Sequence, residues 1–384
     1  MHLGRFHKSI HDVALHFGKA DVPSLLENAA SALDRYASTK TAAAAEEFRT
    51  LLAEVLAHME ISDEDLYQPY AREIIRDLRL ERALPPDLPA RIAATVQARG
   101  FDHTALSADL RVEAVELRKI ISHVLSVDEG MGELGVEWVH VEDAESGGEI
   151  GLLIPREAVG ETLPALTEEF QQLALLFRAI NELTGAQNYD PKVRTISSTD
   201  WQVFLDLGPE QILVWVVIVE RIVSLFKSNL EIKTLQRSLS EKGMPKKITD
   251  LIEKEIEKQV SSSIAGLASD VVSQYSSIDD KPRLNEVETQ LRRGLRYLAK
   301  RLNQGAQVEI NVEVPDDPGE AAAPVDGSPP NELLAKVQAQ RAHIAKLRSL
   351  RGRAGQASIA ASSIKDNPQE LLPYLAESED PPVG

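Results

Sequence analysis

The chain has 384 residues, and 43% of them are apolar, which is enough to bury the cores of two or three domains. Its formal net charge of −18 argues against wholesale binding to nucleic acid or anionic lipid, because an acidic surface repels polyanions. The sequence contains no cysteine, which excludes disulfides, thiolate nucleophiles and cysteine-ligated metal sites.

Composition and the first residues indicate a helix-rich cytoplasmic protein. Aromatic residues make up only 5% of the chain, whereas alanine, leucine, arginine and glutamate dominate, a mixture typical of helical proteins. The frequent alanine and arginine suggest a bacterium with a GC-rich genome. Residues 1–8 contain neither a continuous apolar segment nor a small-residue cleavage site, so we expect no signal peptide and a cytoplasmic location. No apolar run reaches the roughly 20 residues that a membrane-spanning helix needs.

Residues 1–127 show the periodicity of amphipathic helices and no strand pattern. One apolar face recurs at strict four-residue spacing from Leu66 to Leu78. Pro85 and Pro86 end that helix, and Gly100 ends the next one. We therefore predict a helical bundle over residues 1–127.

A small sheet is predicted between residues 128 and 314. Two short β-type runs, 136–141 and 150–154, flank the turn-forming residues 145–148, which predicts a hairpin. Further strands are predicted within 193–207 and at 307–314, where apolar and polar residues alternate as in a half-exposed strand.

The most apolar segment follows Gly208 and predicts a buried central helix over residues 209–242. Pro209 suits the first helical position, since its missing N–H would have no partner there, and Glu210 complements the positive end of the helix dipole. The apolar residues then recur at alternating four- and three-residue steps, as they do along a second helix before Gly185. The two stripes consist of Leu163, Leu166, Phe170, Leu173, Phe177 and Ile180, and of Ile212, Val216, Val219, Val223, Phe226 and Leu230. Each stripe is either core or a coiled-coil seam for self-association or a partner.

The C-terminal region combines acidic and basic segments. Residues 315–330 are rich in proline, glycine and acidic residues, and we predict that they form a linker. We predict a basic helix over residues 331–355 and a disordered tail over residues 356–384. Between Leu333 and Lys365 there are seven lysines and arginines and no acidic residue. The basic helix would dock either on an acidic surface of this protein or on a nucleic-acid backbone. The contact residues would be Lys336, Arg341, Lys346, Arg348, Arg351 and Arg353.

The sequence contains no strong motif for catalysis, cofactor binding or metal binding. The glycines of 130–135 have the spacing of a dinucleotide-binding loop, but a helix precedes them and a strand pattern follows, which reverses the required order. His7 and His11 share a helical face, yet no third ligand is spaced to complete a metal site, so a solvated helix face is the preferred interpretation. We predict no catalytic residue, metal or cofactor.

The sequence as a whole predicts a mainly helical α+β protein. An N-terminal bundle is followed by a domain in which long amphipathic helices pack on a small sheet. We expect an acidic, non-catalytic bacterial protein that acts by oligomerisation or protein-protein interaction through its helical seams. Two alternatives remain: a nucleic-acid-associated accessory protein that uses residues 333–365, and an enzyme whose site is assembled from residues distant in sequence.

Overall fold

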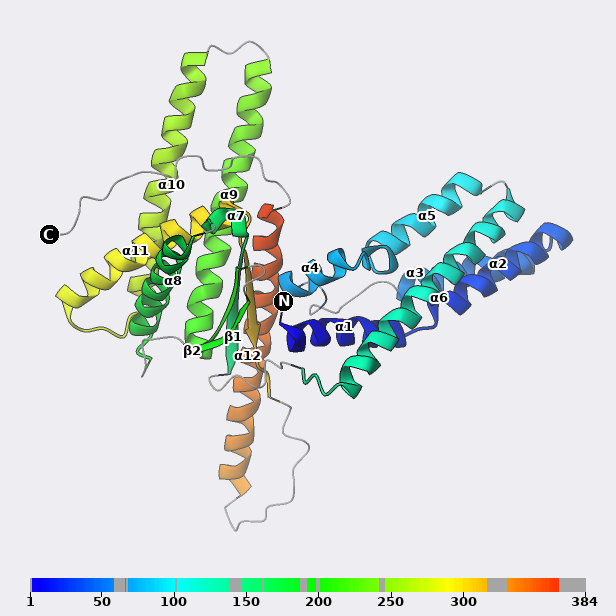
Figure 1. Cartoon of the computed structure of the whole chain (residues 1–384), viewed down its shortest axis with the longest axis horizontal. Coiled ribbons are helices and arrows are strands. Elements are labelled where there is room, and N and C mark those ends of the chain that lie inside the picture. Colours follow the sequence, from blue (N-terminus) through cyan, green and yellow to red (C-terminus); the bar gives the residue numbers. More distant parts are fainter. Residues whose placement is uncertain are drawn as a thin grey trace. The chain divides into compact units, whose positions relative to one another are not determined.

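The computed structural model describes residues 2–58, 66, 68–100, 102–138, 147–160, 162–186, 192–197, 201–241, 246–315 and 330–365. The chain divides into two compact units, Met1–Val139 (unit 1) and His140–Gly384 (unit 2). The described residues are mainly helical with one small antiparallel sheet, which confirms the predicted fold class (Figure 1). No described helix is long and apolar enough to cross a membrane.

The described elements of unit 1 are all helices. Asp21 and Asp102 cap two of them by accepting hydrogen bonds from the backbone N–H groups of Ser24 and Ala105. The helix that Asp21 begins packs against two others around a buried apolar core that includes Leu26. The elements are α1 (Leu3–Gly18), α2 (Val22–Thr39), α3 (Ala42–His58), α4 (Pro69–Asp77), the short 3-10 helix η2 (Glu81–Ala83), α5 (Asp87–Arg99) and α6 (His103–Glu133).

The last helix of unit 1 includes two of the glycines whose spacing resembles a dinucleotide-binding loop. Gly130 and Gly132 lie within α6 and form no loop. Residues 136–138 are not a strand, and 139–141 lie outside the described residues. The backbone carbonyl of Val136 and the ring of Trp138 instead contact histidines of α1.

The sheet of unit 2 has the strand order β2-β3-β1-β4, and all its pairings are antiparallel. β3 and β4 occupy the two sides of β1, so the predicted hairpin between 136–141 and 150–154 is wrong. The other predicted strand regions are confirmed in position, but β4 is not half-exposed as predicted, because Gln307 and Glu309 are each only 5% exposed. The strands are β1 (Gly148–Ile154), β2 (Lys192–Ser197), β3 (Trp201–Asp206) and β4 (Gln307–Val312).

The central helix α9 (Pro209–Glu241) begins at Pro209, as predicted. Ile212, Val216 and Val219 are fully buried. Together with apolar side chains of β1, β3 and β4 they form one continuous core. Trp215 is also fully buried, with its ring centroid 4.7 Å from that of Phe177 in α8 (Leu163–Leu183). The predicted shielding of this segment is thus confirmed, and the sheet contributes to it as well as the helices.

Two further helices complete the core of unit 2. They are α10 (Lys246–Tyr275) and α11 (Lys281–Asn303), and α11 packs along α8. Gly294 lies at this contact, where a Cβ atom would come within 2.6 Å of Leu176 Cδ1. The absence of a side chain there lets the two helices approach closely.

The C-terminal helix α12 (Pro330–Lys365) continues ten residues beyond the predicted end at 355. This part presents small side chains, and Ala354, Ala357 and Ala361 are almost completely buried. Ser358 accepts a hydrogen bond of 3.0 Å from the backbone N–H of Ile310 in β4. Small residues do not produce a stripe of large apolar side chains, so the sequence pattern missed this packing. Residues 316–329 and 366–384, most of the predicted linker and tail, lie outside the described residues.

α9 and α10 extend beyond the sheet as a pair of helices (Figure 1). Among the side chains that the structure describes in these two helices, Asn229 and Val260 are the last well-buried ones at the base of the pair. Residues 231–241 and 246–259 continue past that point, a distance of roughly 16 to 21 Å at 1.5 Å per residue. We call these two segments the arm.

Candidate functional site

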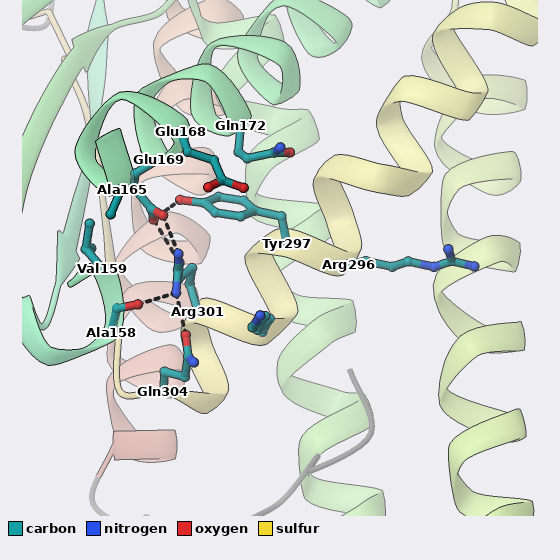
Figure 2. Close-up of a pocket in the computed structure, with 11 residues that line it drawn as sticks. Ala158, Val159, Ala165, Glu168, Glu169, Gln172, Arg296, Tyr297, Arg301 and Gln304 are labelled. Carbon is teal, nitrogen blue, oxygen red and sulfur yellow. Dashed lines mark hydrogen bonds and ion pairs between the residues drawn. The ribbon is translucent and has the colours of Figure 1, made fainter. Parts of the chain in front are cut away.

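A polar pocket of about 400 Å³ lies between α8 and α11 and is the best candidate for a ligand site within unit 2 (Figure 2). The short helix α7 (Arg156–Val159) closes one side of it. Charged or amide side chains dominate the lining. The lining residues are Ala158, Val159, Ala165, Glu168, Glu169, Gln172, Arg296, Tyr297, Lys300, Arg301 and Gln304.

Glu169 is the centre of the hydrogen-bond network in this pocket. Its side chain is only 2% exposed. The Tyr297 hydroxyl donates to Glu169 Oε1, and Arg301 donates to both carboxylate oxygens, with an Nε to Oε1 distance of 2.8 Å. The same guanidinium donates to the carbonyl of Ala158 at 2.6 Å and to Gln304 Oε1 at 2.7 Å. Arg301 therefore ties α7, α8 and α11 together.

The local sequence places these groups on adjacent faces. Tyr297 and Arg301 are four residues apart on α11, so both side chains reach the same turn of α8. The close approach at Gly294, one turn earlier, brings α8 within their reach. Arg301 is therefore not part of a solvated basic face of α11, since it is only 15% exposed and paired with Glu169.

The electrostatics of the network indicate a structural role. Burial raises the pKa of Tyr297, and the adjacent Glu169 carboxylate raises it further, so the phenol stays protonated. The pKa of Arg301 is also raised, since the bidentate pair with Glu169 outweighs desolvation. A catalytic tyrosine would need the opposite shift, towards neutral pH. Figure 2 shows that Arg296 extends away from this network.

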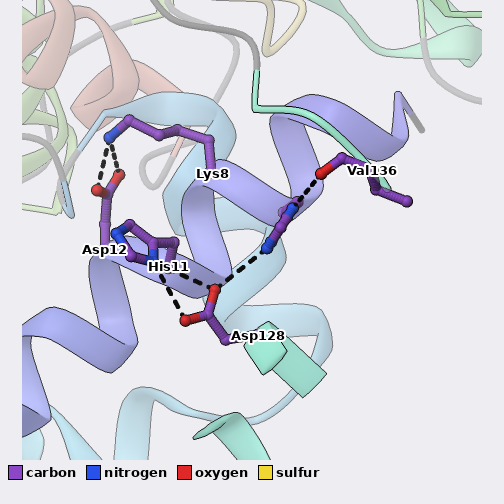
Figure 3. Close-up of polar contacts among 6 residues, drawn as sticks. Lys8, His11, Asp12, Asp128 and Val136 are labelled. Carbon is purple, nitrogen blue, oxygen red and sulfur yellow. Dashed lines mark hydrogen bonds and ion pairs between the residues drawn. The ribbon is translucent and has the colours of Figure 1, made fainter. Parts of the chain in front are cut away.

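A second cluster of titratable residues lies in unit 1, between α1 and α6 (Figure 3). His7 Nδ1 lies 2.6 Å from the carbonyl oxygen of Val136, and its Nε2 lies 3.2 Å from Asp128 Oδ1. His11 Nδ1 lies 3.1 Å from Asp128 Oδ2, and its ring lies against that of Trp138.

These histidines do share a helical face, but the solvated face that we expected is wrong for His7, which is 3% exposed. No group of three or more histidine, aspartate or glutamate side chains suited to a metal ion is found among the described residues. The contacts instead attach the segment after α6 to α1. No sequence pattern points to Asp128 as their partner, because it lies more than a hundred positions away from both histidines.

The predicted seam residues lie mostly inside unit 2. Leu173, Phe177 and Ile180 of the first stripe belong to its core, whereas Leu163 is 73% exposed. Phe170 is partly buried and its ring centroid lies 5.2 Å from that of Trp201. Leu166 is half-buried. In the second stripe all residues from Ile212 to Phe226 are buried in the core, and Leu230 packs against it partly exposed. The helical stripes thus form the core of a single chain.

The basic residues of α12 do not converge on one site. Arg353 donates to Glu220 of α9, with an Nη2 to Oε2 distance of 2.7 Å, and this pair raises the pKa of the arginine. Both side chains are about 40% exposed, so the ion pair adds little stability. The side chains of Arg341, Lys346, Arg348 and Arg351 are exposed, and that of Lys336 lies outside the described residues.

Comparison of the chain with protein-family models, curated proteins and solved structures finds no match.

Proposed function

We propose that this protein is a non-catalytic bacterial cytoplasmic protein that acts by binding a protein chain, either a partner or another copy of itself. The observation that carries the proposal is the arm, in which α9 and α10 leave the core of unit 2 and continue as a pair of helices (Figure 1). In the sequence the apolar stripe of α9 continues into the arm at Leu235 and Leu239. Two helices that extend beyond their core gain stability when a further chain covers them.

The chemistry of the pocket supports a non-catalytic role. The Glu169 carboxylate is saturated by Tyr297 and Arg301, and the pKa values of both donors are shifted away from neutrality. The contact between Arg353 and Glu220 favours docking of the basic helix on its own chain over a nucleic-acid backbone.

The experiment is a measurement of solution mass by light scattering, combined with capture of partners by the tagged full-length chain. We expect a mass above that of the monomer, or a stoichiometric co-purifying protein. The double variant Leu235→Glu and Leu239→Glu should weaken this association, because it places charge in the apolar stripe of the arm. Ser228→Glu, on the exposed side of α9 outside the arm, is the matched control and should leave association unchanged.

A strictly monomeric protein that captures no partner would remove the proposal. If instead the mass stays that of a monomer while the chain retains nucleic acid in a salt-sensitive manner, the alternative function at residues 333–365 would replace it.

A further inference from the structure

The two edges of the sheet in unit 2 differ in what lies against them. At one edge α12 lies against β4, and Ser358 accepts the outward N–H of Ile310. At the other edge β2 is the terminal strand and pairs with β3 alone among the described strands. Its side chains Val193 and Ile196 are 55% and 51% exposed. An edge strand with exposed β-branched residues is a template for pairing with another chain.

A β-bulge in β2 places these two residues on the same face. Val193 pairs with Leu205 and Ile196 pairs with Val203, two positions apart on β3, although three steps separate them on β2. The register shift falls at Arg194, whose guanidinium donates to Glu149 of β1 at 2.7 Å. Residues two apart on a strand share a face, so Val193 and Ile196 both lie on the face of the sheet core.

We propose that β2 pairs with β2 of a second copy of this chain, antiparallel and across a two-fold axis between Arg194 and Thr195. In this register Val193 of each copy lies opposite Ile196 of the other, and all four side chains are on one face. The exposed apolar residues then cover one another, and the two sheets join into one of eight strands. The inference rests on the proposed assembly role and adds, beside the arm, a second surface at which two copies of this chain meet.

The charges of the strand suit this register and disfavour others. Lys192 lies opposite Ser197, and Arg194 lies opposite Thr195, so no two cations face each other across the seam. A bulge and a lysine on an edge strand hinder indiscriminate pairing. In the symmetric register each Lys192 lies opposite a serine, and the bulges of the two copies meet at the two-fold axis.

The absence of cysteine from the chain allows a register-specific test by disulfide trapping. Two full-length variants are made, Val193→Cys and Ile196→Cys, one carrying a size tag. Directly opposite residues of an antiparallel pair have Cα atoms about 4.5 to 5.5 Å apart, within the reach of a disulfide. Two copies of Val193, or two of Ile196, would be separated by three steps along the strand, roughly 10 Å, which is too far.

We expect the mixture of the two variants to form disulfide-linked heterodimers at least about tenfold faster than either variant alone. Leu163→Cys is the matched control, because Leu163 is exposed and apolar but lies on α8. It should not cross-link with either partner above the background rate. In parallel, Ile196→Lys should lower the dimer fraction measured by light scattering, and Leu163→Lys should not.

Equal cross-linking of all mixtures, or none, would overturn the inference. If light scattering still shows an oligomer in that case, the assembly role stands and another surface carries it. If the chain is monomeric and captures no partner, the assembly role fails as well.

Discussion

At the scale of single residues, the Glu169 network sets how α7, α8 and α11 are joined. A buried carboxylate is stable only while its partners neutralise it and fill its hydrogen-bonding positions. Tyr297 and Arg301 do both for Glu169. The pocket beside this network therefore has one wall that is fixed by paired groups.

Removing the cation of this network should be costly. We expect Arg301→Met to lower the free energy of unfolding by about 3 to 5 kcal/mol, because it leaves the Glu169 carboxylate buried without its cation. Tyr297→Phe removes one hydrogen bond to a charged group and should cost about 1.5 to 3 kcal/mol. Urea unfolding followed by circular dichroism measures both. Lys300→Met, in the same pocket, is the control, and an equal loss in this variant would contradict the assignment.

A second ion pair joins the other ends of α8 and α11 and makes stability depend on pH. Arg283 donates to both oxygens of Glu182, at 2.5 and 2.6 Å, and this hydrogen bonding lowers the pKa of the carboxyl in the folded state. A lowered folded-state pKa means that the stabilisation is present above the ordinary value of 4.5 and is lost as pH falls through the folded-state value.

Glu182→Gln should therefore reduce the loss of stability on acidification from pH 7 to below pH 4. The difference between wild type and variant should be on the order of 1 kcal/mol at neutral pH and should vanish in acid. Thermal unfolding at several pH values provides the measurement, with Glu231→Gln as an exposed control on α9. Parallel pH profiles for wild type and Glu182→Gln would exclude this contribution.

At the scale of elements, α8 and α11 run antiparallel and are joined at three levels. Glu169 meets Arg301, Leu176 meets Gly294, and Glu182 meets Arg283. Ion pairs at both ends and a close apolar contact between them fix the alignment of the two helices. This alignment in turn positions every side chain of the polar pocket.

The helical glycines Gly294 and Gly266 give a matched test of that contact. Gly294→Ala places a methyl group against Leu176 and should cost about 1 to 3 kcal/mol through overpacking. At Gly266 in α10 a Cβ meets nothing within 4 Å, so Gly266→Ala should stabilise by roughly 0.5 to 1 kcal/mol through helix propensity. Differential scanning calorimetry should show melting temperatures shifted in opposite directions. A stabilising Gly294→Ala would mean that α8 and α11 are less closely packed than described here.

At the scale of the whole molecule, each unit carries its own apolar core. The core of unit 1 is built from α2, α3, α5 and α6 with their neighbours, and that of unit 2 from the sheet and α8 to α12. Neither cluster contains a residue of the other unit. Independent cores are the property that lets a domain fold alone.

We accordingly expect a fragment of residues 2–138 to fold by itself. It should be monomeric and strongly helical, and should unfold in one cooperative transition, because the apolar core around Leu26 is built from residues of unit 1. Circular dichroism and thermal melting measure this, and Leu110→Ala, which opens a cavity in the core of unit 1, should lower the melting temperature. A fragment without a cooperative transition would show that unit 1 needs the rest of the chain.

The sequence by itself determined the class of the fold and the position of the central helix. Apolar periodicity and the proline at the start of α9 are local signals, and the buried side chains from Ile212 to Val219 follow from them. Strand-type residues also located β1, β2 and β3, and the alternation of apolar and polar residues located β4. The pattern failed at residues 136–138, which form no strand and instead contact histidines of α1.

Only the tertiary structure decided which residues meet. The partners of Glu169 are 128 and 132 positions away, and Ile310 and Ser358, which are bonded to each other, are 48 positions apart. No local sequence pattern carries information over such separations. The same holds for the role of the two apolar stripes, since core and interface require the same side chains at the same spacing. Whether a stripe is covered by its own chain depends on how distant segments pack, and packing is a property of the folded molecule.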